Sequence, residues 1–456
     1  MQEICIVGSG ILGLCTAYYT LELSPTTRVT LVENSLSRTI AGGASSQSGG
    51  FLAGGKAWHE GLAQDLGRLS WEEHVALADK LGGREQYGFR ESTAAGLNVG
   101  GQDEDRSKYR TLPGGSGRKK VEAKDGKSWV EGEREELSTE GGVGQVDPAQ
   151  FCKVLFQHLS TAYLDRFTTI FGNVDSLSSP SSSSSSSTRR ILSIIPLLPS
   201  FPSPSSTSPI HLPVDHLVVA AGPWSAAVLA QLSLPSIPLR NLPGHSLLIR
   251  PNLTDFPFDT LPSAAVFAGI SGAVVGVHAS TSGLARHLTA AEKSAGFTAS
   301  PEMFTRKNGL VFVAGENSIP ETGEADRTVE LSGGRGRVTL LNKLPPTVDE
   351  VKEMTDPALS ARLTRAAGLV SPLLDEKKGA VVEKRQFCYR PTTPDMEPVM
   401  GKIAPGVWIS TGHGPWGITQ APGSGKVIAE QMLGLPTSAD VAGLHPRRFN
   451  QTKAKL

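Results

Sequence analysis

The sequence lacks the features that mark several large classes of protein. It has only four cysteines, Cys5, Cys15, Cys152 and Cys388, and no C-x-x-C pair, so neither a zinc site nor a disulfide framework is predicted. Basic residues (44) and acidic residues (44) balance, giving a formal net charge of +0. No overall field would therefore attract nucleic acid or an acidic membrane.

Long apolar runs and a leader segment are lacking too. No run approaches the ~20 apolar residues of a membrane-spanning helix, so no transmembrane segment is predicted. Residues 4–7 already have the pattern of a buried strand, which leaves no room for a signal peptide. We therefore expect an intracellular protein, whose 456 residues are enough for two or three domains.

The first 33 residues carry a strand, a glycine turn, a helix and a second strand that ends in Glu33. Gly8 permits a tight turn, Gly10 lets the backbone approach a pyrophosphate, and Gly13 lets the helix pack close to the strand. The helix N-terminus would bind the phosphates. Glu33 would accept hydrogen bonds from a ribose 2′-OH and would repel the 2′-phosphate of NADP. The pattern predicts a dinucleotide site rather than a structural turn alone.

A second glycine turn lies near the other end of the chain. Residues 407–411 are predicted to form a strand, residues 412–417 the turn, and a helix is expected from Ile418 to residue 433. A cofactor held by both ends of the chain suits a flavin, which is gripped along its whole length, better than NAD. FAD is therefore the predicted cofactor.

Small residues fill positions 41–50, which suits a backbone wrapped around a ligand, with a flexible loop as the alternative. Asp147 followed by Pro148 predicts a capped helix start. Residues 347–370 have the pattern of one amphipathic helix. Strands of a second sheet are expected at residues 246–249, 274–277 and 310–313.

Residues 180–209 are of low complexity and rich in serine and proline. Such a segment cannot bury enough apolar surface to order itself fully. We expect an exposed insertion between two strands.

These motifs, in this order, resemble those of the D-amino-acid oxidase superfamily of FAD oxidoreductases, which includes glycine oxidase, sarcosine oxidase and amino-acid dehydrogenases. The motifs are residues 8–13 with Glu33, 43–50, 146–148, 218–225, 390–395 and 412–414. The resemblance implies an α/β fold, with a discontinuous Rossmann-like FAD-binding domain and a mixed, largely antiparallel α+β substrate domain. We expect residues 1–95, 140–235 and 395–436 in the first domain, 96–139 and 236–394 in the second, and a C-terminal tail at 437–456.

The resemblance also implies a reaction. The family passes a hydride from a carbon that bears an amine to flavin N5, and the resulting imine hydrolyses. Arg390, which precedes a proline, is expected to bind a substrate carboxylate through its guanidinium fork. A structural salt bridge from Arg390 to Asp395 or Glu397 is the alternative.

Two further residues have a role only by resemblance. Cys388 lies where sarcosine oxidases attach the flavin covalently, although a buried unreacted thiol is nearly as well supported. His413 in the second glycine turn would stabilise negative charge on the reduced flavin, and a packed turn histidine is the alternative.

The sarcosine oxidases also carry an oxygen-activating lysine. Val313 stands at its apparent counterpart, and Lys307 falls too early in the strand.

Three functions therefore stay open. The first is an amine or amino-acid oxidase that passes electrons to oxygen, and the second is a dehydrogenase with another acceptor. The third is a flavin-binding protein with a structural or trafficking role. The predicted catalytic residues are Arg390 and His413, and no metal site is predicted. The predicted cofactor-binding residues are Gly8, Gly10, Ile11, Leu12, Gly13, Glu33, Ser45, Ser46, Gln47, Ser48, Gly49, Ala221, Gly222, Trp224, Cys388, Gly412, His413, Gly414, Gly417 and Ile418.

The chain ends in Ala454, Lys455 and Leu456, a close variant of the Ser-Lys-Leu peroxisomal address. The tail predicts a peroxisomal import receptor as a partner and the peroxisome as the location. A chance basic tail on a cytoplasmic protein is the alternative. Because peroxisomes hold many flavin oxidases that form hydrogen peroxide, the address favours an oxidase over a dehydrogenase.

Overall fold

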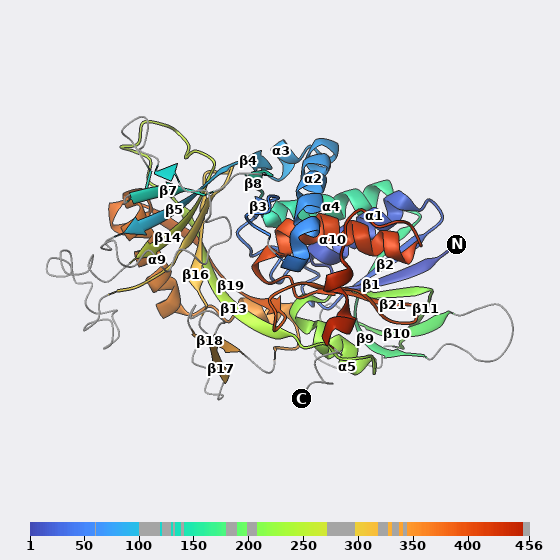
Figure 1. The fold of residues 1–456 in the computed structure, drawn as a ribbon. Coiled ribbons are helices and arrows are strands. Elements are labelled where there is room, and N and C mark those ends of the chain that lie inside the picture. The colour runs from blue at the N-terminus through green and yellow to red at the C-terminus, as the bar shows by residue number, and fades with distance from the viewer. Residues whose placement is uncertain are drawn as a thin grey trace.

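The computed structural model describes residues 1–59, 61–99, 119–120, 129–130, 133–137, 141–178, 189–197, 208–270, 297–317, 327–330, 337–340 and 344–449. Figure 1 shows two bodies side by side, each built around a large β-sheet. Both ends of the described chain enter the body on the right of that view.

The first body contains an eight-stranded sheet with the order β11-β10-β9-β2-β1-β12-β21-β20. Its strands are β1 (Glu3–Val7), β2 (Arg28–Glu33), β9 (Phe167–Leu177), β10 (Arg190–Pro196), β11 (Ile210–Val214), β12 (His216–Val219), β20 (Val399–Ala404) and β21 (Val407–Thr411). The five central strands from β9 to β21 run parallel, as in a Rossmann-like sheet.

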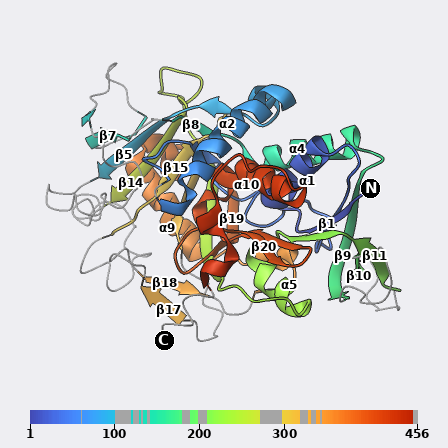
Figure 2. The ribbon, with the colours of Figure 1, turned by 45° about the vertical axis from the view of Figure 1, so that its right-hand side comes forward.

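Four helices cover one face of this sheet, and α5 (Ser225–Gln231) lies on the other face (Figure 2). The four are α1 (Ile11–Leu23), α2 (Gln64–Leu81), α4 (Pro148–Ala162) and α10 (Gly417–Met432). Their core includes Leu14, Phe151 and Ile428, all fully buried. A Cβ on Gly425 of α10 would meet the backbone of Cys15 in α1, so the two helices that follow the glycine turns pack directly together.

The second body contains a sheet with the order β19-β13-β16-β15-β14-β5-β7-β6. Its strands are β5 (Thr93–Val99), β6 (Lys119–Lys120), β7 (Glu133–Glu136), β13 (Arg240–Arg250), β14 (Ala264–Ile270), β15 (Glu302–Thr305), β16 (Val311–Glu316) and β19 (Val381–Thr392). Every neighbouring pair is antiparallel except β14 with β5. The expected combination of a Rossmann-like domain with a largely antiparallel substrate domain is therefore confirmed.

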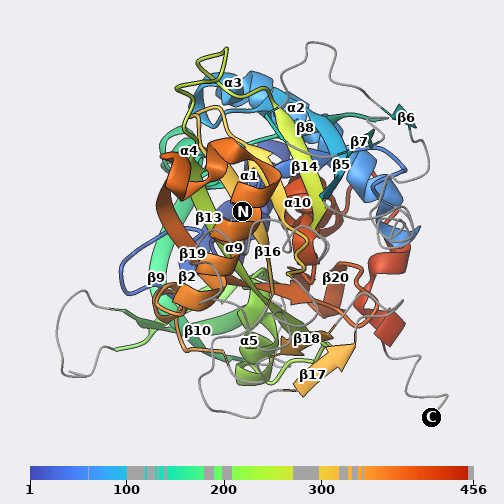
Figure 3. The same cartoon turned by 90° about the vertical axis from the view of Figure 1, so that its left-hand side faces the viewer.

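Helix α9 (Pro357–Val370) packs on the outer face of the second sheet, across β13 and β16 (Figure 3). Leu363, Ala367 and Val370 meet Val311 and Val313 there. The inner face carries aromatic side chains and points toward the first body.

Smaller elements join these bodies. They are β3 (Phe51–Ala53), β4 (Arg90–Glu91) and β8 (Val143–Gln145) in one small sheet, the pair β17 (Arg327–Glu330) and β18 (Arg337–Leu340), and the short helices α3 (Gly83–Gln86) and α8 (Val348–Lys352).

All four cysteines are buried free thiols. In the described part of the chain, no helix has both the length and the apolar content needed to cross a membrane.

The single helix expected over 347–370 is wrong. The chain forms α8 and then α9, because the Asp356 carboxylate accepts hydrogen bonds from the N–H groups of Ala358 (2.7 Å) and Leu359 (3.2 Å) and starts a new helix at Pro357. The strand expected at 274–277 lies outside the described residues.

The expectation of an exposed insertion at 180–209 is wrong for its middle. Strand β10 lies between β9 and β11 there, and the side chains of Leu192 and Ile194 are fully buried. Serine and proline on both sides mask a short apolar strand. Residues 179–188 and 198–207 lie outside the described residues.

We predict that Leu192→Ala lowers the free energy of unfolding by about 2–5 kcal/mol, because it opens a cavity in a filled core. Ile191 is the matched control, since it precedes Leu192 on the same strand and is 39% exposed. Ile191→Ala should change the free energy by roughly 0.5 kcal/mol or less. Denaturant unfolding of both variants measures the difference, and two equally small effects would show that β10 does not contribute to the core.

Candidate active site

A cavity of about 1980 Å³ lies between the two bodies and is lined by residues of both. It exceeds the roughly 300–1,000 Å³ of an ordinary small-molecule pocket. Both glycine turns, the small-residue segment, the turn after β12 and strand β19 reach it. Motifs that are up to 400 residues apart in the sequence therefore share one site.

The first glycine turn opens on the cavity where α1 begins. Gly8 has a φ of 108°, which a residue with a side chain rarely adopts, and it makes the tight turn possible. A Cβ on Gly13 would collide with the Gly8 carbonyl oxygen, so Gly13 serves helix packing. Gly10, Ile11 and Leu12 line the cavity at the end of the helix where free N–H groups favour phosphate.

Glu33 ends β2 at the rim of the same turn. Its Oε2 accepts a hydrogen bond from the backbone N–H of Ser9 at 2.7 Å. Burial raises the pKa of Glu33, and the hydrogen bonds from Ser9 oppose that shift. The carboxylate is thus fixed at the cavity wall, at the place where the sequence predicts a ribose contact.

The small-residue segment is held to α1 and to itself, which argues against the flexible-loop alternative. The N–H of Ile11 donates to Ser45 Oγ at 3.0 Å, and Ser48 Oγ donates to the Ser45 carbonyl at 2.9 Å. Gln47 Nε2 donates to the Gly42 carbonyl at 3.3 Å. Its backbone follows the cavity wall and can wrap a cofactor.

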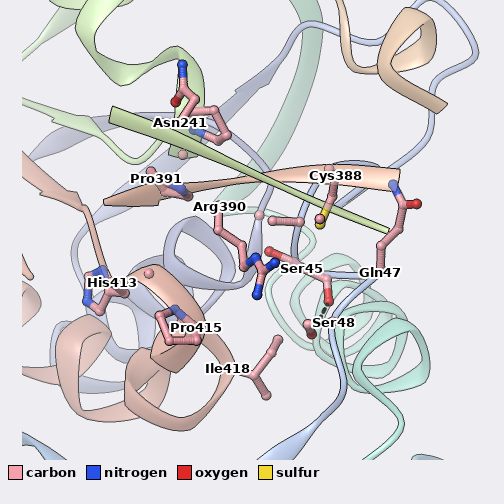
Figure 4. A pocket seen from close by; sticks show the side chains of 18 of the residues that line it. Ser45, Gln47, Ser48, Asn241, Cys388, Arg390, Pro391, His413, Pro415 and Ile418 are labelled. Atoms are coloured by element: carbon pink, nitrogen blue, oxygen red, sulfur yellow. Dashed lines mark hydrogen bonds between the residues drawn. The ribbon is translucent and has the colours of Figure 1, made fainter. Parts of the chain in front are cut away.

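Arg390 on β19 points into the cavity, toward the side where Ser45 and Ser48 lie (Figure 4). Its guanidinium donates to Asn317 Oδ1 and, at 3.4 Å, to the Pro243 carbonyl. A Cβ on Gly244 would collide with the guanidinium, so a glycine on β13 makes room for it. The Arg390 Nε is buried without a partner.

The alternative of a structural salt bridge from Arg390 is wrong. Asp395 pairs with Arg448 instead, at 2.8 Å. The hydrogen bonds of Arg390 go to Asn317 and Pro243, not to Glu397. The guanidinium therefore keeps capacity for an anion in the cavity.

Cys388 lies two residues before Arg390 and lines the same cavity. Burial raises the pKa of its thiol, and the Arg390 charge opposes that shift. His413 also lines the cavity, but its Nε2 is bonded to Ser424 Oγ at 2.9 Å. Burial lowers the pKa of His413 to about 3, so the imidazole is neutral, which favours the packed-histidine alternative.

Most of the predicted site residues line this cavity. Those that do are Gly8, Gly10, Ile11, Leu12, Glu33, Ser45, Gln47, Ser48, Gly49, Ala221, Gly222, Trp224, Cys388, Arg390, His413, Gly414, Gly417 and Ile418. Gly13, Ser46 and Gly412 do not. The sequence does not mark Gly244, Glu302 and Asn317 as site residues, because Gly244 and Glu302 stand in the second sheet and Asn317 directly follows β16, all outside any motif.

Strand β16 carries Val313, the apparent counterpart of the oxygen-activating lysine of sarcosine oxidases. Val313 faces α9 in the outer core, whereas Phe312 and Ala314 face the cavity. Lys307 is paired with Glu85 at the surface. Of the described residues that line the cavity, Arg240 and Arg390 are basic and none is a lysine.

The fold and the site together define a two-domain flavin-dependent oxidoreductase. A family model described as "FAD dependent oxidoreductase" (DAO) matches residues 3–431, and the chain belongs to that family. Protein C1F5.03c of Schizosaccharomyces pombe is 26% identical over 459 residues, which cover 98% of each chain.

Two solved structures have a similar fold. Glycine oxidase from Geobacillus kaustophilus gives a TM-score of 0.66 at 18% identity and covers 98% of this chain and 99% of its own. L-proline dehydrogenase from P. horikoshii gives 0.64 at 14% identity, with 99% and 98% covered.

The cavity fits FAD on its own geometry. Gly10 leaves open the space beside the α1 N-terminus, because a Cβ there would meet only Ser45 Oγ at 3.2 Å. Gly222 faces open space, since its Cβ would have no neighbour within 4 Å. The first glycine turn and Glu33 would hold the adenine-nucleotide end of FAD. The 45–49 segment and the 413–418 turn would hold its flavin end.

Proposed function

We propose that this protein oxidises the carbon–nitrogen bond of an amino acid or secondary amine that carries a carboxylate, and that oxygen takes up the electrons to give hydrogen peroxide. The cavity-facing guanidinium of Arg390 carries the proposal, because a buried fork of N–H donors matches a carboxylate. When bound, FAD supplies the hydride acceptor, flavin N5.

The chain's own residues would bind and orient the substrate. Asn317 holds the Arg390 guanidinium, and the gap at Gly244 sets its direction. The aromatic rings of Phe51, Phe304 and Phe312 stack on one another and form an apolar part of the cavity wall. A carboxylate fixed on Arg390 inside this wall would present its neighbouring carbon in a limited set of orientations.

A dehydrogenase is the second candidate, and one observation favours it. The described cavity lining contains no lysine that could serve as the family's oxygen-activating residue. Flavin reduction by substrate without oxygen uptake would identify this function. The third alternative, a structural flavin protein, drew its support from the 180–209 insertion, part of which is strand β10.

We predict that Arg390→Ala raises the KM for carboxylated amines roughly 30- to 1000-fold, since a lost charge-assisted pair costs about 2–4 kcal/mol. Amines without a carboxylate should be affected far less. Arg385→Ala is the matched control, because Arg385 is exposed on the same strand. Steady-state kinetics of both variants measure the effect, and equal losses on both substrate types would make Arg390 a structural residue.

Covalent attachment of the flavin to Cys388 stays a prediction. It is supported by the place of the thiol in the cavity wall, two residues from Arg390. If the bond forms, acid precipitation leaves a yellow pellet, and Cys388→Ser releases the colour to the supernatant. A colourless pellet from the unmodified protein removes the covalent hypothesis.

Peroxisomal import is also a proposal, and Ala454–Leu456 lies outside the described residues. It is supported by the sequence of the tail and by the hydrogen peroxide of the proposed reaction. A fluorescent protein fused to the N-terminus should give puncta that coincide with a peroxisome marker. Removing the last three residues should make the signal diffuse, and a diffuse signal from the intact fusion would rule out the address.

A further inference from the structure

Glu302, the first residue of β15, brings an acidic side chain to the cavity wall. It lies opposite Phe267 on β14 and Ala314 on β16, on the inner face of the sheet. Within the described residues its carboxylate has no hydrogen bond or ion pair. Glu316 differs, because it is paired with Arg362 of α9 at 3.1 Å.

An unpaired carboxylate at this place is costly. Burial raises the pKa of Glu302, and the charge of Arg390 opposes that shift only in part. A partly buried acid that has no partner within the described residues favours a ligand that brings a positive charge to it. The cavity thus offers Arg390 as an anion-binding group and Glu302 as a cation-binding group.

The surroundings of Glu302 also suit a cation. Phe304 follows on the same face of β15, with its ring 5.7 Å from that of Phe267 and 5.9 Å from that of Phe312. Ring faces attract ammonium groups, and they do so more strongly when water is excluded. A carboxylate bordered by aromatic rings is a typical environment for a bound ammonium.

The two charged groups come from strands that are not neighbours in the sheet. The Arg390 guanidinium lies over Gly244 of β13, and β16 separates β13 from β15. Neighbouring strands are roughly 4.8 Å apart, so the backbones of β13 and β15 are about 10 Å apart. Side chains that lean toward each other shorten this distance. The carboxylate and α-ammonium of one small amino acid lie closer together than this.

The amine that is oxidised would also be a poor partner for the Glu302 carboxylate on chemical grounds. It must lose its proton before hydride transfer, whereas a permanent ion pair with a carboxylate favours the protonated form. A charge at the far end of a side chain stays protonated throughout the reaction. It can therefore bind Glu302 without opposing the chemistry.

We infer that Glu302 selects substrates that carry a second, distal positive charge, so that the substrate class is that of basic amino acids, with the carboxylate on Arg390 and the side-chain cation on Glu302. This inference rests on the proposed function for its chemistry, but it concerns binding and can be tested without turnover.

The test compares caproate and ε-aminocaproate, which have the same six-carbon chain and differ by one terminal ammonium. Each is titrated into the flavin-loaded protein, and the dissociation constant is taken from the flavin absorption spectrum. The unmodified protein should bind ε-aminocaproate at least about 10-fold more tightly, as one charge-assisted contact implies. Glu302→Gln should reduce the preference to about twofold or less, with caproate affinity kept.

Two variants control for fold and for net charge. Glu302→Asp keeps the charge and should keep most of the preference, while Glu350→Gln removes an exposed acid from α8 and should leave both affinities unchanged. No preference in the unmodified protein, or an equal loss for both ligands in Glu302→Gln, would overturn the inference. Failure of the proposed function looks different: the preference would persist, but no amine would reduce the flavin.

Discussion

The buried ion pair between Arg306 and Asp147 joins the two bodies around the cavity. Arg306 follows β15, its side chain is only 4% exposed, and it donates to Asp147 Oδ2 at 3.3 Å and to the Ser48 carbonyl at 3.0 Å. Asp147 also caps α4 through its other oxygen. The pair therefore links a helix of the first body, a strand end of the second and the segment that would wrap the flavin. Removing either partner would leave a buried charge unpaired.

This link explains why the cavity has charged groups at defined places. It sets β15 against the 41–50 segment, so that Phe304 meets Gly49 and Glu302 lies further along the same face. Arg390 reaches the cavity from the edge strand β19, over the gap at Gly244. A substrate with both charges would be held at two points, which orients it more strictly than a single carboxylate contact does.

The parts of this structure that the sequence could predict are those where a local pattern has one physical meaning. Gly8, Gly13 and Glu33 have the geometry expected of them, and Asp147 caps α4 as predicted. The same Asp-Pro pair at 356–357 also starts a helix, but the apolar periodicity continues across it and by itself predicts one uninterrupted helix. Strand β10 was hidden by its serine-rich flanks, and its order comes from pairing with β9 and β11. Glu302 could not be predicted as a site residue, since only the sheet register brings it to the cavity.

The proposed reaction requires that a carboxylated amine reduces a flavin bound between these two sheets. The most direct measurement mixes the purified flavin-loaded protein, without air, with a panel of neutral and basic amino acids and simple amines, and follows the flavin absorption near its visible maximum. We expect rapid bleaching by at least one amine that carries a carboxylate, and recovery of the colour when an electron acceptor is admitted. A flavin that stays oxidised with every member of the panel would contradict it.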